Sequence, residues 1–290
     1  LDHAVPQDLV AHFVPLLEHS EDRFALHALG RLGKDRVVKV GIEFLAKRAG
    51  ITIPQDNRYE ERGISRKRIY EMNLEAAKFF RNCLFDEQYG KEALAYLHEH
   101  RKLSMATIKH FGLGYSPNNW WMLTNYMKGK GYTDDELATG FLCGKSQKNG
   151  RLYDYFRNRV MFPIIDVSGN IVAFGGRVMD DSKPKYLNTS DTPAFKKSRN
   201  LFALNYARKF AEKEMILCEG YMDVIQLHAA GFENAVATLG TAITPEHARI
   251  VKKYTSNVVL AYDSDSAGQN ATSKALRILN DAGVDAKVIR

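Results

Sequence analysis

Residues 215–231 read MILCEGYMDVIQLHAAG, and this stretch decides the fold. Its first four residues, Met215–Cys218, are an apolar run of strand length, and residues 221–230 have the apolar spacing of a helix. The same order returns at residues 258–268, VVLAYDSDSAG, where an apolar run leads through acidic residues into a helical segment. Two strands that are each followed by a helix predict units of a parallel α/β sheet.

Strand and helix patterns alternate from Lys213 to the end of the sequence. The pair Thr244-Pro245 predicts a helix start, and Gly231 and Gly283 stand where helices are expected to stop. The predicted strands are 215–218, 235–239, 258–262 and 286–289, and the predicted helices are 221–230, 245–254 and 267–282. The fold class is therefore predicted to be α/β, with a parallel-sheet domain preceded by a mixed α+β basic subdomain and a helical N-terminal segment.

Acidic side chains stand where two of the predicted strands end. Glu219 follows the first of them, and Asp263 and Asp265 follow another. Because open parallel sheets bind ligands just outside the carboxyl ends of their strands, we expect these three carboxylates to share one crevice. Hard divalent cations such as Mg²⁺ prefer oxygen ligands, so the pattern indicates a metal site. The competing interpretation is that these acids only form turns or cap helices.

The excess positive charge of the chain is concentrated in one segment. The formal net charge is +7, and residues 151–209 hold 11 Lys and Arg against 5 Asp and no Glu, which leaves +6. A predicted hairpin, with strands at 160–166 and 171–174, carries Arg157 and Arg159 before it and Gly175-Gly176-Arg177 after it; Lys185, Lys196 and Lys197 follow. Paired glycines allow close approach to a phosphate, and guanidinium groups bind phosphate oxygens. We interpret this segment as a polyanion-binding face rather than an ordinary solvated hairpin.

The part of the chain before residue 151 reads as helical. Residues 1–57 predict helices without recognisable chemistry, residues 56–67 predict a linker, and helical patterns resume at Arg68. The pair Trp120-Trp121 is predicted to begin a further helix and to pack in the core, with base stacking as the alternative. The predicted domains are residues 1–57, a helical segment of unclear role; 58–210, a basic subdomain; and 211–290, the parallel-sheet domain.

Other classes of protein are disfavoured by the sequence. The three cysteines, Cys83, Cys143 and Cys218, have no metal-binding spacing, so no zinc site is predicted and a reduced, cytoplasmic location is expected. No apolar stretch approaches the roughly 20 residues of a membrane helix, so no membrane partner is predicted. The sequence starts at Leu1 and stops at Arg290 just after a predicted strand, and we therefore expect it to be part of a longer protein.

Several motifs together resemble known proteins. The acidic stretches at 219–223 and 263–268 resemble a TOPRIM domain, the metal-binding module of topoisomerases, primases and some nucleases. RNRVMFPI at 157–164, FGGR at 174–177, PKYLN at 184–188 and LGTA at 239–242 narrow the resemblance to bacterial DnaG-type DNA primases. It covers about residues 68–290.

The resemblance implies synthesis of short RNA primers on single-stranded DNA from nucleoside triphosphates, with Mg²⁺ or Mn²⁺ as cofactor. The implied catalytic acids are Glu219, Asp263, Asp265 and Asp223, the first three as metal ligands. The implied nucleotide- and DNA-binding residues are Arg101, Arg157, Arg159, Arg177, Lys185, Tyr186, Asn188, Lys197 and Gly220. It further implies a bacterial, nucleoid-associated location, and a replicative helicase as a partner of the full-length protein through a domain absent here.

The sequence departs from the family pattern at two motifs. Arg101-Lys102-Leu103 stands where the family commonly has Arg-Gly-Leu, and Ser264 replaces the usual Gly between the two aspartates. The family's Cys/His zinc-binding domain is not recognisable, and residues 1 to about 40 match no expected segment. Two alternatives therefore stay open: a TOPRIM nuclease or topoisomerase fragment, and a module that only binds single-stranded DNA.

Overall fold

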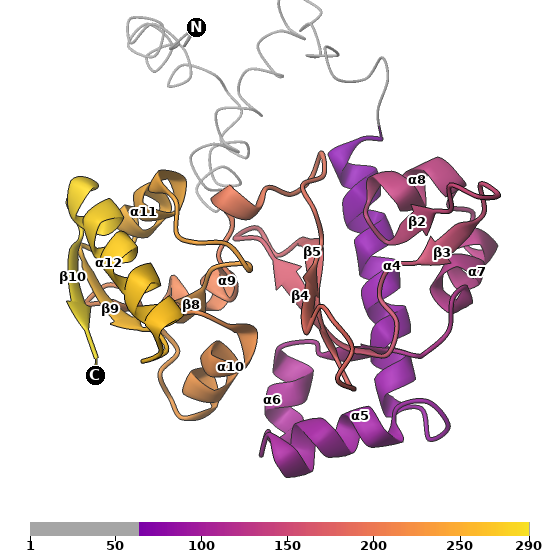
Figure 1. The fold of residues 1–290 in the computed structure, drawn as a ribbon, viewed down its shortest axis with the longest axis horizontal. Coiled ribbons are helices and arrows are strands. Elements are labelled where there is room, and N and C mark those ends of the chain that lie inside the picture. The colour runs from indigo at the N-terminus through magenta and orange to yellow at the C-terminus, as the bar shows by residue number, and fades with distance from the viewer. Residues whose placement is uncertain (1–63, 290) are drawn as a thin grey trace, which may run out of the picture. The chain divides into compact units, whose positions relative to one another are not determined.

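The computed structural model describes residues 64–289, and these residues belong to one compact unit (Figure 1). Its helices are α4 (Arg66–Phe85), α5 (Lys91–Ala95), α6 (Met105–His110), α7 (Met122–Gly129), α8 (Asp134–Thr139), α9 (Leu204–Ala207), α10 (Tyr221–Ala229), α11 (Pro245–Lys252) and α12 (Ser266–Asp281). A π-helical turn, η2 (Tyr96–His100), continues α5, and η3 (Lys197–Arg199) is a 3₁₀ turn. The strands are β1 (Gly114–Ser116), β2 (Cys143–Lys145), β3 (Leu152–Asp154), β4 (Arg159–Ile165), β5 (Ile171–Val178), β6 (Tyr186–Asn188), β7 (Met215–Cys218), β8 (Ala235–Ala237), β9 (Asn257–Ala261) and β10 (Asp285–Val288).

The basic part of the chain is built on an antiparallel sheet with the strand order β1-β4-β5-β6. The turn between β4 and β5 is closed by Asp166, whose Oδ1 accepts hydrogen bonds of 2.9 Å from the backbone N–H groups of Ser168 and Asn170. Gly169 in this turn has a φ of +90°, a conformation that glycine adopts without strain. The predicted hairpin is confirmed, and β5 extends through Arg177 to Val178.

The C-terminal part is a parallel sheet with the strand order β10-β9-β7-β8. Cys218 at the end of β7 pairs with Ala261 at the end of β9. Because paired parallel strands end at the same edge, the residues that follow these two strands leave the sheet together. This register brings Glu219 to Asp263 across 44 residues of sequence.

Three hydrophobic cores define the layers. Val160, Phe162 and Ile164 of β4 face a core that includes α10 and one face of the parallel sheet, whereas Met161 faces α4, α7 and α8. The period of two expected of a strand thus gives β4 two buried faces. The other face of the parallel sheet packs against α11 and α12. Figure 1 shows α7, α8, β2 and β3 on the far side of α4 from the parallel sheet.

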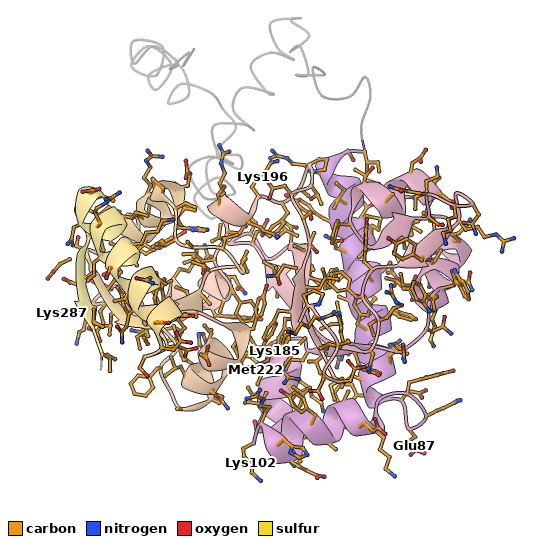
Figure 2. The ribbon with its side chains drawn as sticks, in the orientation of Figure 1. Glu87, Lys102, Lys185, Lys196, Met222 and Lys287 are labelled. Atoms are coloured by element: carbon orange, nitrogen blue, oxygen red, sulfur yellow. The ribbon has the colours of Figure 1, made fainter. Side chains whose placement is uncertain are left out.

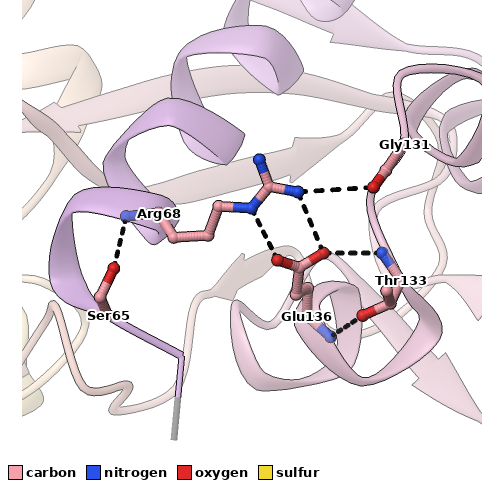
Figure 3. Close-up of polar contacts among 5 residues, drawn as sticks. All are labelled: Ser65, Arg68, Gly131, Thr133 and Glu136. Atoms are coloured by element: carbon pink, nitrogen blue, oxygen red, sulfur yellow. Dashed lines mark hydrogen bonds and ion pairs between the residues drawn. The ribbon is translucent and has the colours of Figure 1, made fainter. Parts of the chain in front are cut away.

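A charged pair joins the start of α4 to α8 (Figure 3). Nε of Arg68 donates a hydrogen bond of 2.6 Å to Oε1 of Glu136, and Nη2 donates to Oε2 at 3.3 Å and to the carbonyl oxygen of Gly131 at 3.4 Å. Glu136 also closes the capping box of α8, because its Oε2 accepts from the N–H of Thr133 at 2.7 Å. The Ser65 hydroxyl accepts from the N–H of Arg68 and begins α4.

The structure corrects the sequence-based expectations in several places. The helix α4 already begins at Arg66, within the segment expected to be a linker. The short strands β1, β2 and β3 were not predicted, because three-residue strands leave little periodicity. Core packing of Trp120 and Trp121 is wrong, since these side chains are 51% and 52% exposed. The helices expected within residues 1–57 lie outside the described residues, and the domain boundaries at 58 and 211 remain predictions.

Candidate metal and nucleotide site

Two of the predicted acids meet at the edge of the parallel sheet. Glu219 follows β7 and Asp263 follows β9, and the backbone N–H of Asp263 donates a hydrogen bond of 3.1 Å to Oε1 of Glu219. The pairing of the two strands therefore fixes the Glu219 carboxylate against the turn that carries the aspartates. This contact joins the two acidic stretches.

The turn is held tightly by Asp265 and Gly268. Oδ1 of Asp265 accepts a hydrogen bond of 2.7 Å from the N–H of Gly268 and caps α12. A Cβ atom on Gly268 would lie 2.0 Å from the carbonyl oxygen of Asp263 and 3.0 Å from Oε1 of Glu219. Only glycine fits there. Asp265 thus has the helix-capping role that was the competing interpretation of the acidic residues. Its other carboxylate oxygen, Oδ2, does not take part in this cap.

The start of α10 brings a further carboxylate to this edge. Oδ2 of Asp223 accepts a hydrogen bond of 3.2 Å from the backbone N–H of Gly220, so Asp223 folds back over the first turn of the helix. Burial and the nearby Asp263 carboxylate raise the pKa of Asp223, whereas Arg101 lowers it. Asp223 therefore lies between the acidic turn and a basic side chain.

Electrostatic repulsion marks the acidic edge. Burial raises the pKa of Glu219, the hydrogen bond from Asp263 lowers it, and the carboxylates of Asp263, Asp265 and Asp223 raise it further. Among residues 64–289 none of these acids forms an ion pair with Lys, Arg or His, and no three potential ligands form a ready-made metal cluster. Crowded hard oxygen donors without a cationic partner fit a divalent cation.

A basic cluster lies next to the acidic edge. The ring of Tyr96, on η2, has the guanidinium carbon of Arg177 at 4.7 Å and that of Arg101 at 5.3 Å from its centroid. Nε of Arg101 also donates a hydrogen bond of 2.6 Å to the Tyr96 hydroxyl. The Nε of Arg177 is buried and has no hydrogen-bond partner in the described structure, although its Nη1 donates to the carbonyl oxygen of Val178. Tyr96 thus gathers two arginines that are distant in sequence.

Tyr186 connects this cluster with the acids. Burial raises the pKa of Tyr186, and its surroundings include the charges of Arg177, Arg101 and Asp223. Lys185 precedes it and is exposed, and Figure 2 shows Lys185 between the elements of the two sheets, away from Lys287 on the outer strand β10. The basic and acidic candidates therefore converge from separate sheets.

Asn188 joins the two sheets directly. Its Oδ1 accepts a hydrogen bond of 2.7 Å from the hydroxyl of Tyr221, and its Nδ2 donates to the carbonyl oxygen of Leu239 at 3.2 Å. The Tyr221 ring stacks on Phe162 with centroids 5.0 Å apart and lies against Gly175, where a Cβ atom would come within 2.6 Å of the ring. The amide of Asn188 is thus largely committed to the junction.

Three other predicted basic residues lie outside this cluster. Arg159 is buried, and its guanidinium donates to the carbonyl oxygens of Gly176, Lys185 and Pro184 at 2.9–3.3 Å. Arg157 stacks on Trp120 and donates to the carbonyl oxygen of Asp154. Lys197 lies on η3, where its carbonyl oxygen is 2.8 Å from Nε2 of His247. These contacts hold Arg159 in the fold, whereas Lys197 keeps a free ammonium group among the described residues.

Sequence reasoning missed Tyr96 and Tyr221. Both are aromatic residues close in sequence to charged residues that were predicted for the site. Tyr96 stands five residues before Arg101, and Tyr221 stands two residues after Glu219. A buried hydroxyl normally has a polar partner, so tyrosines beside candidate site residues were the available signal.

Comparisons with known proteins identify the family of the chain. Residues 79–208 match a family model described as DNA primase catalytic core, N-terminal domain, and residues 216–290 match a Toprim-like model. A DNA primase of Clostridium acetobutylicum is 45% identical over 253 residues, which cover 86% of this chain and 41% of that protein. The RNA polymerase domain of Mycobacterium tuberculosis primase DnaG, solved with double-stranded DNA, is similar with a TM-score of 0.69 and 30% identity, covering 78% of this chain and 74% of that one.

The chain belongs to the bacterial DnaG-type DNA primase family. A solved DnaG primase catalytic domain bound to single-stranded DNA is similar with a TM-score of 0.66 and 35% identity, covering 73% of this chain and 66% of that one. The chain spans about two fifths of the length of the curated primases it matches. Toprim domains bind divalent metal ions, which agrees with the crowded carboxylates. None of the helices in residues 64–289 is long and apolar enough to span a membrane.

Proposed function

We propose that this chain is the catalytic core of a DNA primase, a DNA-directed RNA polymerase that synthesises short RNA primers on single-stranded DNA during replication. The primer 3′-hydroxyl attacks the α-phosphate of a nucleoside triphosphate, and pyrophosphate leaves. The observation that carries the proposal is the hydrogen bond between the Asp263 N–H and Glu219, because it assembles an acidic edge beside two arginines that share Tyr96.

The acids have distinct parts in this proposal. Glu219, Asp263 and Asp265 would hold Mg²⁺ or Mn²⁺, and Asp223 would support them from α10. When bound there, a divalent cation would supply charge neutralisation for the triphosphate and activation of the attacking hydroxyl. Because Gly268 has no side chain, the Glu219 carboxylate can lie against the turn, and its position is therefore set before substrate binds.

The basic residues bind the polyanions. Arg101 and Arg177 are held by Tyr96 with nitrogen atoms left for phosphate oxygens, a preorganised arrangement that spares side-chain entropy on binding. Lys185, Lys197 and the segment from Tyr186 to Asn188 extend this face towards the template and the growing RNA primer. Gly220 presents its backbone at the start of α10. A replicative helicase is the proposed partner of the longer protein, and the bacterial cytoplasm is the proposed location.

The experiment is primer synthesis on single-stranded DNA with nucleoside triphosphates and Mg²⁺ or Mn²⁺. Glu219→Gln removes one negative charge from the acidic edge and should abolish RNA product while DNA affinity stays nearly unchanged. Glu233→Gln is the matched control, because Glu233 is exposed and lies between α10 and β8, outside the site.

Two results would contradict the proposal. Metal-dependent cleavage of DNA without RNA synthesis would favour the Toprim nuclease alternative. Salt-sensitive DNA binding with no synthesis, even after the C-terminal residues of longer relatives are added, would favour the alternative that the chain only binds single-stranded DNA.

A further inference from the structure

A cavity lies between the end of α4 and the helical segment α5–η2, outside the candidate site. Its volume is about 600 Å³, which is within the range of cavities that bind ligands. The residues that follow α4, one side of α5–η2 and the start of α6 form its walls. Figure 2 shows Glu87, on one of these walls, well apart from Lys185 of the candidate site.

The floor of the cavity is apolar. It is lined by Leu84 and Phe85 at the end of α4, Leu94 and Ala95 on α5, and Met105 at the start of α6. Leu84 is buried, whereas the other four side chains are only partly buried and leave apolar surface open to solvent. Because removal of such surface from water is favourable, the floor fits a large apolar side chain of another molecule.

The rim of the cavity is acidic. It carries the carboxylates of Asp86, Glu87 and Glu99 against one ammonium group, that of Lys91, and all four side chains are exposed. None of them forms an ion pair with another residue of the range 64–289. The rim is therefore negatively charged, although the chain as a whole has a formal net charge of +7.

The cavity and the basic cluster use different sides of the segment α5–η2. Residues four positions apart lie on the same side of a helix, so Leu94 with His98 and Ala95 with Glu99 form one wall of the cavity. Tyr96 does not line the cavity, and its ring instead contacts the guanidinium groups of two arginines. A ligand in the cavity would therefore leave the basic cluster free.

The charge of the rim selects the chemistry of the ligand. Nucleic acids and nucleoside triphosphates are polyanions, which the three carboxylates would repel. A polypeptide segment with a large apolar side chain between basic residues matches both the floor and the rim. Protein surfaces commonly recognise such segments through a pocket for one apolar anchor and complementary charges around it.

We propose that this cavity docks a short segment of a partner protein in which Lys or Arg residues flank one large apolar side chain. The apolar side chain fills the floor, and the basic residues pair with Glu87 and Glu99 on the rim. The docking site is independent of the proposed primase function, because neither the acidic edge nor the basic cluster takes part in it.

Synthetic peptides test the match between ligand and cavity. Titration of a fluorescein-labelled peptide of sequence KKFLKK with the full chain should give a saturable rise in anisotropy. The peptide KKSSKK has the same charge and should bind about 10- to 100-fold more weakly, the factor expected from the loss of one buried apolar side chain. The acidic peptide EEFLEE should not bind. Equal affinities of KKFLKK and KKSSKK, or no binding of KKFLKK, would overturn the proposal.

Charge reversal locates the bound peptide. Glu87→Lys and Glu99→Lys should each weaken KKFLKK binding about 3- to 10-fold, because each change replaces an exposed ion pair with repulsion. Both side chains are exposed, so the fold tolerates the change. Glu233→Lys is the matched control, because Glu233 is also exposed but lies between α10 and β8, and it should leave the affinity unchanged. Equal affinities in all three variants would also overturn the proposal.

Two further measurements test other places and occupants. Glu219→Gln should bind KKFLKK as tightly as the wild-type chain does, and weaker binding would instead place the peptide on the acidic edge and overturn the proposal. Sedimentation of the chain without peptide tests whether a second copy fills the cavity. A dimer that Glu99→Lys dissociates would overturn the proposal, whereas an unchanged sedimentation coefficient in this variant supports a separate partner.

Discussion

The hydroxyl of Tyr221 donates a hydrogen bond of 2.7 Å to Oδ1 of Asn188, and this contact joins the antiparallel sheet to the first turn of α10. Asn188 belongs to the basic face, and Tyr221 stands two residues after Glu219. The pair therefore sets the position of the basic strand β6 against the acidic edge. The two residues are 33 positions apart in the sequence, and their hydrogen bond links the antiparallel sheet to the helix that follows β7.

Tyr221→Phe should lower the free energy of unfolding by about 1–2 kcal/mol, because it leaves the partly buried Asn188 amide without its partner. Denaturant unfolding measures this change. Tyr206→Phe is the control, since the Tyr206 hydroxyl donates to the exposed carbonyl oxygen of His110, where water can replace it. Equal losses in the two variants would show that burial of the junction has no effect.

Gly268→Ala should destabilise the protein by about 1–3 kcal/mol, the range for over-packing, and should reduce primer synthesis. The added Cβ atom would lie 2.0 Å from the carbonyl oxygen of Asp263, so the acidic turn must shift. Gly129→Ala meets nothing within 4 Å and should have little effect on either property. Thermal unfolding measures the stability of the two variants, and a primer-synthesis assay measures their activity. Normal synthesis by the Gly268→Ala variant would show that the close packing at Gly268 is not needed for the proposed function.

Arg177→Ala should weaken binding of single-stranded DNA or nucleotide and reduce the salt dependence of binding. Loss of one phosphate contact lowers the slope of log K against log salt by about 0.7 on single strands. Titrations at several salt concentrations measure the slope, with Arg277→Ala on the exposed face of α12 as the control. An unchanged slope in Arg177→Ala excludes this residue from the phosphate-binding face.

Stability should fall as the pH drops below about 6.5, the ordinary pKa of histidine. His247 is fully buried, and burial lowers its pKa. Its Nε2 lies 2.8 Å and 3.1 Å from the carbonyl oxygens of Lys197 and Asn200, which require a proton there, while Nδ1 accepts from the N–H of Thr244. A second proton on the ring would sit on Nδ1 and oppose the N–H of Thr244, so the folded protein disfavours the charged imidazole. The unfolded chain therefore binds this proton at a higher pH than the folded protein does. The stability present above the ordinary histidine pKa of about 6.5 is consequently lost as the pH falls below it.

His247→Gln should remove its share of this pH dependence. Denaturant unfolding between about pH 5 and pH 8, the range around the ordinary histidine pKa, measures the slope, and His110→Gln at an exposed position is the control. The half-buried His228, whose pKa is also lowered by desolvation, retains its own contribution in both variants. A slope that is identical in wild type and His247→Gln would contradict the assignment.

The parallel sheet was predictable because its signals are local. The apolar run Met215–Cys218 matches β7, and the predicted start of α11 at Thr244-Pro245 is confirmed by the hydrogen bond from His247 N–H to the Thr244 hydroxyl. Gly231 and Gly283 end helices with φ values of +93° and +72°. Each of these features depends on a few adjacent residues. Three-residue strands such as β2 and β3 have no comparable local signal.

The sequence by itself determined the order of strands and helices in the parallel-sheet part and the acids that follow β7 and β9, because periodicity, caps and turns act within a few residues. Only the tertiary structure decided that Arg101 and Arg177 share Tyr96, that Asn188 bonds to Tyr221, and that Arg159 is buried. It also decided that Trp120 and Trp121 face solvent. These contacts depend on the packing of distant segments, where the burial of each side chain is set by neighbours that local sequence patterns do not specify.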